Sequence, residues 1–211
     1  MTEWFFMILK TLMLGPLQNN CYILTDEQTG ESAIFDPAND GEKIVNFIQA
    51  QGIKVKYIIL THTHIDHIAA LDYVKRYTGA PVAVHKAEAD MLNDDEGVMA
   101  FILDTHAPQT ICDIALSDGD ELSLGKSILK VIHTPGHTMG GICVLCGDIL
   151  ISGDTLFNES VGRTDFKGGD YAQLACSIKE RLFVLDDDVS VYPGHGPSTT
   201  IAHEKQFNPF L

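Results

Sequence analysis

Short runs of apolar residues, separated by residues that favour turns, recur along the chain and predict β-strands. In segment 57–60 every side chain is aliphatic or aromatic, which is typical of a strand buried on both faces of a sheet. Most of the other runs are flanked by Gly, Asp, Asn or Pro, as expected where strands end in turns. The predicted strands are 21–24, 33–35, 57–60, 82–84, 129–132, 141–145, 149–151 and 189–192.

Helical spacing of apolar residues occurs between these strands. Segment 41–51 has apolar side chains at positions 44, 45, 47 and 48, on one helix face, and Gly52 follows as a C-terminal cap. Strands and helices mixed in this way indicate a layered α/β protein, but the pattern alone does not determine its topology. Without a repeat, a low-complexity tract or a linker, we expect a single domain over residues 1–211. The other predicted helices are 68–77, 172–183 and 199–206.

The apolar N-terminal run 4–9 is similar to the core of a signal peptide. However, Glu3 precedes it in place of a basic residue, Lys10 interrupts it, and no small-x-small cleavage site follows. No stretch of the chain approaches the ~20 apolar residues of a membrane span. We therefore expect this run to form a first, buried strand.

The cysteines and the charge limit the compartment and the partners. Five cysteines without a disulfide framework favour a reducing compartment, which we take to be the cytoplasm. The lone C-x-x-C of Cys143 and Cys146 lies in an apolar run, so we interpret both as core residues on opposite faces of a strand. The net charge of −15 repels phosphate backbones and anionic lipids, so we expect no nucleic-acid and no membrane partner. An anionic small molecule is not excluded, since a metal pocket is locally positive. The oligomeric state is left open.

Four side chains of metal-ligand type lie within six positions, directly after strand 57–60. Residues two apart share a side of an extended chain, so His62 and His64 can converge. The chain must then turn into the helix that begins near Ile68, and this turn can direct Asp66 and His67 to a neighbouring point. Imidazole together with carboxylate suits zinc, iron or manganese better than calcium or magnesium. A polar loop that is merely rich in histidine is the weaker interpretation, because the spacing suits divalent metal ligation.

Three further candidates follow predicted strands in the second half: His137, Asp154 and His195. Each has a glycine directly before it, which allows a tight turn and a close approach of the backbone. The two oxygens of the Asp154 carboxylate can bridge two metals. His133 is a candidate for orienting a ligand from outside the metal's own shell. The histidines without this setting are interpreted as surface or core residues: His85, His106 and His203.

These motifs resemble those of the metallo-β-lactamase superfamily in order and spacing, across nearly the whole chain. They are T-H-x-H-x-D-H, H-T-P-G-H-T, S-G-D-T-L-F and P-G-H-G, and segments 162–166 and 208–211 are most similar to the short glyoxalase II-like hydrolases. The resemblance implies an αββα sandwich with the metals at one edge of its two sheets. It also implies two ligand sets joined by a bridging residue: His62, His64 and His137; Asp66, His67 and His195; and Asp154 between them.

The implied activity is hydrolysis of a small-molecule thioester such as S-lactoylglutathione, with two divalent metal ions as cofactors. Zinc is expected, with iron or manganese as alternatives. A hydroxide bridging the metals would attack the carbonyl, and Asp66 would orient it as a catalytic residue. Arg163, in a glycine-flanked loop, is the candidate substrate-binding residue, although an ion pair with Asp165 is the simpler role. Segment 88–114 has little pattern and is a lid or a plain connection.

Other functions are possible for the same motifs. A sulfur dioxygenase of the superfamily would hold one iron through His62, His137 and Asp154. A β-lactamase is normally exported, a nuclease of the superfamily has an extra cap domain, and a binding module without catalysis should have lost some of the seven ligands. Full-length glyoxalase II has a C-terminal helical domain that binds glutathione, whereas sixteen residues follow His195 here. We therefore expect a weak grip on the glutathione part of a substrate.

Overall fold

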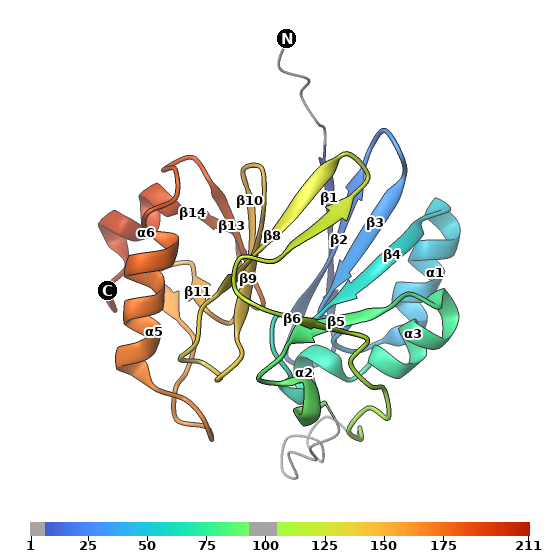
Figure 1. The fold of residues 1–211 in the computed structure, drawn as a ribbon, viewed down its shortest axis with the longest axis horizontal. Coiled ribbons are helices and arrows are strands. Elements are labelled where there is room, and N and C mark those ends of the chain that lie inside the picture. Colours follow the sequence, from blue (N-terminus) through green and yellow to red (C-terminus); the bar gives the residue numbers. More distant parts are fainter. Residues whose placement is uncertain (1–6, 93–104) are drawn as a thin grey trace.

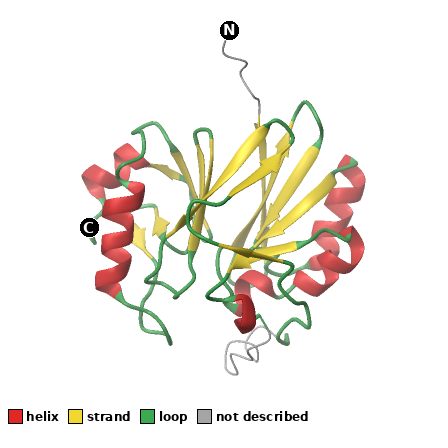
Figure 2. Cartoon of the chain, in the orientation of Figure 1, coloured by secondary structure: helices red, strands yellow, loops and turns green. Residues whose placement is uncertain are grey.

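The chain folds into two β-sheets that face each other, with helices on both outer sides (Figures 1 and 2). The computed structural model describes residues 7–92 and 105–211. Its layers run helix, sheet, sheet, helix, which confirms the expected αββα sandwich. No helix of the described ranges is long and apolar enough to cross a membrane.

The first sheet is built from the N-terminal half, in the order β1-β2-β3-β4-β5-β6. β1, β2 and β3 pair antiparallel, whereas β3 to β6 run parallel. Parallel neighbours require crossovers, and helices α1 (Gly41–Gln51) and α3 (Leu71–Thr78) lie in two of them, on the outer face. The strands are β1 (Met7–Leu14), β2 (Asn19–Asp26), β3 (Glu31–Phe35), β4 (Lys54–Ile59), β5 (Val82–His85) and β6 (Ile114–Leu116).

The second sheet has the order β14-β13-β10-β9-β8-β7, and only β10 and β13 are parallel among its paired strands in the described chain. Its outer face is covered by α5 (Tyr171–Ser177), which continues as a π-helical turn over Ile178–Leu182, and by α6 (Ile201–Phe207). The strands are β7 (Glu121–Leu124), β8 (Ser127–His133), β9 (Ile142–Cys146), β10 (Ile149–Gly153), β13 (Ser190–Pro193) and β14 (Thr199–Thr200), with a separate hairpin of β11 (Leu156–Phe157) and β12 (Ser160–Val161).

Because both sheets are covered on both faces, the core divides into three clusters. Ile58 of β4 packs with residues of α1 and α3, whereas its neighbour Ile59 packs between the sheets. This is the two-residue alternation of a strand, and it explains why segment 57–60 is apolar throughout. Cys143 packs toward α5 and Cys146 between the sheets, and both are buried, as predicted.

The predicted strands all occur, and helix 41–51 is confirmed to the residue, with Gly52 at φ 62° as its cap. Three predictions are wrong in part. The helix expected at 199–206 begins at Ile201, because Thr199–Thr200 pairs with β13 as strand β14. The helix expected at 68–77 begins at Leu71, and a separate short helix α2 (Ile65–Ile68) precedes it. The run 4–9, expected to be a buried strand, is only partly buried in its described part, because β1 lies at the sheet edge: Ile8 is 39% exposed, whereas Met7 and Leu9 pack partly buried against the core between the sheets. Residues 4–6 of that run lie outside the described residues.

Segment 88–114 is described only in part. It contains a short 3-10 helix, η1 (Ala89–Met91), and ends at the start of β6. Residues 93–104 lie outside the described residues, so the choice between a lid and a connection stays a prediction.

Candidate metal centre

The predicted ligands lie just beyond the C-terminal ends of strands from both sheets. His62 and His64 follow β4, and His137 follows β8. Asp154 comes directly after β10, and His195 comes two residues after β13. A backbone hydrogen bond from Ile142 N to Thr61 O, 2.9 Å long, joins the two sheets at this edge. Residues that are 133 positions apart in the sequence, from His62 to His195, therefore meet at one place.

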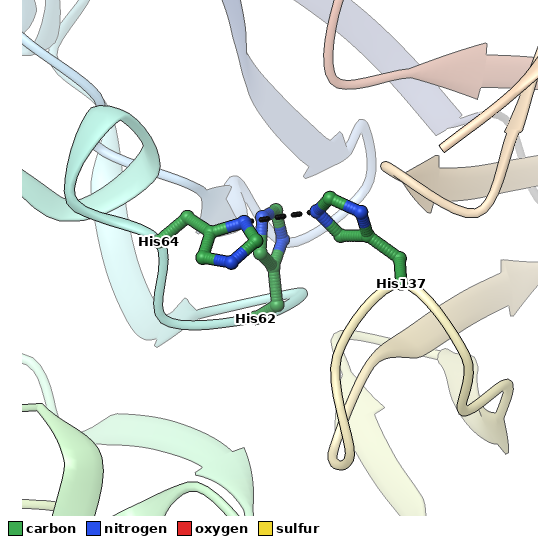
Figure 3. Close-up of side chains that lie close together, drawn as sticks. All are labelled: His62, His64 and His137. Atoms are coloured by element: carbon green, nitrogen blue, oxygen red, sulfur yellow. Dashed lines mark hydrogen bonds between the residues drawn. The ribbon is translucent and has the colours of Figure 1, made fainter. Parts of the chain in front are cut away.

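Three histidines form the first cluster, which Figure 3 shows with their rings turned toward one another. The ligand atoms of His62, His64 and His137 all lie within 4.8 Å of each other. His64 Nδ1 is 2.9 Å from His137 Nε2, the contact drawn as a dashed line in Figure 3. Two of these histidines come from one sheet and the third from the other.

The second cluster is Asp66, His67 and His195, whose ligand atoms also lie within 4.8 Å of each other. Asp66 Oδ2 is 3.3 Å from His195 Nε2. Asp66 and His67 lie within α2 and not in a turn before a helix, because His64 is already the extended residue at the N-cap of α2. The expected convergence is therefore achieved by a helical turn that begins three residues earlier than predicted.

Asp154 lies between the two clusters. Its Oδ1 is 3.3 Å from His67 Nε2, and its Oδ2 is 3.7 Å from both His137 Nε2 and His195 Nε2. One carboxylate thus faces a histidine of the first cluster and two of the second. This is the placement that a bridging ligand requires.

The unsatisfied polar atoms fit bound cations. His62 Nε2, His67 Nε2 and Asp154 Oδ1 are buried and make no hydrogen bond within the described residues. Buried polar atoms are nearly always paired, so three unpaired atoms at one place fit a site that binds cations. Gly194 adds to this, because a Cβ there would lie 2.3 Å from Asp154 Oδ1 and 2.6 Å from His67 Cε1. The donor set of imidazole and carboxylate suits transition metals.

The comparison with protein families decides the classification. The family model described as Metallo-beta-lactamase superfamily matches residues 14–195. This chain belongs to the metallo-β-lactamase superfamily. Among its relatives, the Probable metallo-hydrolase YqgX of Bacillus subtilis is 38% identical over 208 residues, which are 96% of each chain. The Hydroxyacylglutathione hydrolase GloC of Haemophilus influenzae is 32% identical over 217 residues, covering 97% of this chain and 98% of GloC.

Solved structures of the same fold agree. BLEG-1 B3 metallo-beta-lactamase has a TM-score of 0.91 and 36% identity, covering 97% of this chain and 99% of its own. TTHA1623 in a di-iron-bound form has a TM-score of 0.87 and 34% identity, and the match covers 96% of this chain and 100% of TTHA1623. ETHE1 from Myxococcus xanthus has a TM-score of 0.79 and 29% identity, and the match covers 96% of this chain and 83% of ETHE1. The superfamily fold is therefore shared with proteins named as hydroxyacylglutathione hydrolase and as metallo-beta-lactamase.

In this member of the superfamily, outer hydrogen bonds fix which ring nitrogen faces the centre. His67 Nδ1 donates to Asp36 Oδ2 at 3.0 Å, and His137 Nδ1 donates to the Arg163 carbonyl at 2.6 Å. The Thr61 hydroxyl donates to Asp36, so it accepts from His62 Nδ1 at 3.0 Å. With Nδ1 occupied, Nε2 is the ring nitrogen of His62, His67 and His137 that faces the centre, which is how protein groups behind metal-binding histidines orient them.

Two residues that hydrogen-bond to the candidate ligands were not predicted from the sequence. Asp36 is buried and also accepts from the Thr61 N–H at 2.8 Å. It follows strand β3 directly, so part of the signal that identified Asp154, a carboxylate just after a strand, was present in the sequence, although no glycine precedes Asp36. Asn19 donates from Nδ2 to Asp66 Oδ2 at 2.9 Å and lies 3.2 Å from His195 Nε2. Nothing in the local pattern around Asn19 distinguishes it from a turn residue.

The electrostatics of the cluster favour positive charge at its centre. Burial would lower the pKa of His67, but Asp154 and Asp66 outweigh it and raise that pKa well above its ordinary value. Burial alone would raise the pKa of Asp66, but His67 and the hydrogen bonds from His195 and Asn19 hold it well below its usual range. His64 is different, because burial, with His137 beside it, lowers its pKa to about 4. Its ring is therefore neutral at pH 7 and able to act as a ligand.

The other histidines do not join the centre. His133 Nε2 donates to the Met139 carbonyl at 3.0 Å, and the His133 ring stacks on the His85 ring with centroids 4.0 Å apart. Neither partner is a proposed ligand, so the suggestion that His133 orients a ligand is not supported by its contacts. His85 is buried and His203 pairs with Glu159, in keeping with core and surface roles.

Arg163 lies beside the centre but is already engaged. Its Nε and one terminal nitrogen donate to the two oxygens of Asp165, each at 2.7 Å. The guanidinium also lies 3.9 Å from the centroid of the Phe166 ring, and that ring meets His64 edge-on at 5.5 Å. The ion pair expected as the simpler role therefore exists, and the Phe166 ring connects the guanidinium to His64 of the first cluster.

Gly194 provides a test of the space at the centre. We expect Gly194→Ala to lower metal content sharply while the chain stays folded, because the added Cβ would intrude on Asp154 Oδ1 and φ at this residue is not positive. Metal analysis and circular dichroism of the purified variant measure both effects. A variant that keeps the parent's metal content would contradict the geometry.

Proposed function

We propose that this protein is a dinuclear metal-dependent hydrolase that cleaves small thioesters of the S-lactoylglutathione type. The observation that carries the proposal is Asp154, whose carboxylate lies between two separate clusters of ligand atoms. Seven ligand side chains are more than one tetrahedral site uses. The relative GloC is named a hydroxyacylglutathione hydrolase, which supports thioesters of glutathione as the substrate class. We propose zinc as the metal, with iron or manganese as alternatives. The structure of the relative TTHA1623 in a di-iron-bound form supports iron as an alternative.

The proposed ligand sets are His62, His64 and His137 for one ion and Asp66, His67 and His195 for the other, bridged by Asp154. When bound, two such cations would supply Lewis acidity and would lower the pKa of a bound water toward neutrality. Asp66 is held by Asn19 at Oδ2, and in our proposal it accepts a hydrogen bond from the attacking water and directs the lone pair at the carbonyl carbon. A thiolate leaves without much protonation, since a thiol pKa is about 8.5.

We propose a small-molecule thioester as the partner of this protein. We propose the cytoplasm as its location. In support of a reducing compartment, all five cysteines of the chain are free thiols. The weak grip on glutathione stays a prediction. A relative that this chain covers over 98% of its length is named Hydroxyacylglutathione hydrolase, so selectivity for glutathione must be measured directly.

The experiment combines metal analysis with a substrate panel. Protein loaded separately with Zn²⁺, Mn²⁺ and, without oxygen, Fe²⁺ is tested on S-lactoylglutathione, on truncated and uncharged thioesters, and on a β-lactam. Chelator-treated protein is the control. We expect about two ions per chain and hydrolysis of thioesters with a high KM. One iron per chain, no thioester hydrolysis, and oxygen uptake with glutathione persulfide would assign the dioxygenase activity instead.

Arg163 and Asp165 provide a prediction about substrate charge. We propose that Arg163 contacts a substrate carboxylate, in competition with Asp165. Arg163→Ala should then lower kcat/KM for anionic thioesters about 2–5-fold, since exposed ion pairs contribute at most ~1 kcal/mol, and leave neutral thioesters unchanged. Asp165→Asn, the matched variant, frees the guanidinium and should raise kcat/KM for anionic thioesters. Equal effects on charged and neutral substrates in either variant would rule out this contact.

A further inference from the structure

Glu88 is a buried carboxylate that none of the sequence motifs includes. It lies three residues beyond β5, and it is 0% exposed. Its Oε2 accepts hydrogen bonds from the Thr63 N–H at 2.7 Å and from the Thr63 hydroxyl at 2.9 Å. Its Oε1 accepts from the Gly140 N–H at 2.8 Å. One side chain thus links two loops that belong to different sheets.

These two loops contain the three-histidine cluster. Thr63 stands between His62 and His64, and Gly140 is three residues after His137. We propose that Glu88 is a positioning residue for the metal centre, which sets the distance between the His62–His64 loop and the His137 loop. This inference rests on the metal centre of the proposed function and not on the substrate.

The geometry favours this role over simple core filling. Each carboxylate oxygen serves one loop, so the loops cannot separate without breaking a hydrogen bond to a buried anion, which costs more than losing a neutral one. The packing is also close, because a Cβ at Gly140 would lie 2.8 Å from Glu88 Cγ. The three hydrogen bonds from the two loops offset the burial of the Glu88 carboxylate.

The test is Glu88→Gln, which keeps the size of the side chain but places an amide NH₂ opposite Thr63 N–H or Gly140 N–H. The hydrogen bonds by which Glu88 joins the two loops, here called the Glu88 clamp, are then lost at one of the loops. Groups that position metal ligands typically contribute 10–100-fold to affinity. We expect the variant to bind one of two Zn²⁺ ions about 10–100-fold more weakly, measured by competition with a chelator, and to show an altered absorption spectrum when loaded with Co²⁺.

Glu204→Gln is the matched control. Glu204 is also buried, and it accepts hydrogen bonds from Thr199 Oγ1 at 2.6 Å, Asn208 Nδ2 at 2.8 Å and Glu159 N at 3.0 Å. None of these donors lies in the two loops at the centre. Glu204→Gln should therefore destabilise the metal-free protein to a similar degree, measured by thermal unfolding, and leave Zn²⁺ affinity and the Co²⁺ spectrum unchanged.

Thr63→Val is a milder second variant if Glu88→Gln does not fold, because it removes one hydrogen bond of the clamp and should weaken Zn²⁺ binding by a smaller factor. Equal Zn²⁺ affinity in parent, Glu88→Gln and Thr63→Val would overturn the inference, as would equal losses in Glu88→Gln and Glu204→Gln. A parent that binds no Zn²⁺ would overturn it too. A parent that binds two ions and hydrolyses no thioester contradicts the proposed function only, and the Zn²⁺ comparison still decides the role of Glu88.

Discussion

Replacing Asp154 by alanine is expected to abolish metal loading and thioester hydrolysis together. Its two oxygens face His67 on one side and His137 and His195 on the other, so both ions would lose a ligand in one substitution. We expect the metal content to fall from about two ions per chain to well below one. Hydrolysis should fall by on the order of 10³-fold or more, since the loss exceeds that of a single oxyanion contact.

The matched variant for this experiment is His133→Ala. His133 is near in sequence to His137, but its contacts are the Met139 carbonyl and the His85 ring. We expect His133→Ala to retain the parent's metal content and hydrolysis within a few-fold. Elemental analysis and a thioester assay on the same preparations measure both quantities. Two bound ions in Asp154→Ala, or equal collapse of both variants, would refute the assignment of Asp154 as the bridge.

The second large effect is expected for Asp36→Ala, on stability as well as on metal binding. Asp36 is buried and accepts three hydrogen bonds, from the Thr61 N–H, the Thr61 hydroxyl and His67 Nδ1. Alanine would leave three buried donors unpaired, at about 1–3 kcal/mol each. We expect the free energy of unfolding of the metal-free protein to fall by about 3–5 kcal/mol, measured with urea. Zn²⁺ affinity should also fall, because the His67 ring loses its outer partner.

Asp26→Ala separates these two effects. Asp26 is equally buried and accepts hydrogen bonds from Thr29 N, Thr29 Oγ1 and Lys126 N, away from the metal centre. It should lose comparable stability and keep the parent's Zn²⁺ affinity. If Asp26→Ala lost Zn²⁺ affinity as strongly as Asp36→Ala, the effect of Asp36 would be general unfolding. If Asp36→Ala kept the parent's free energy of unfolding, the hydrogen bonds from Thr61 and His67 to Asp36 would not stabilise the fold.

Local sequence patterns determined most secondary structure and the identity of the candidate ligands. Helix 41–51 was predictable to the residue because apolar spacing and the Gly52 cap are both local signals. Segment 57–60 was predictable as a buried strand because it is apolar throughout. The ligand candidates were identifiable because His and Asp residues directly follow strands, often after glycine. The start of α2 at Ile65 was missed because a four-residue helix contains too few positions to show a period.

Only the tertiary structure decided how these residues are grouped and what holds them. The pairing of His137 with His62 and His64, the position of Asp154 between the clusters, and the clamp through Glu88 all join segments from different sheets. Contacts at such separations depend on how the sheets pack, which no window along the chain contains. The capture of Arg163 by Asp165 depends likewise on the side-chain conformations in one folded loop. The sequence by itself identified the candidate ligands, and the packing of the two sheets determined their geometry.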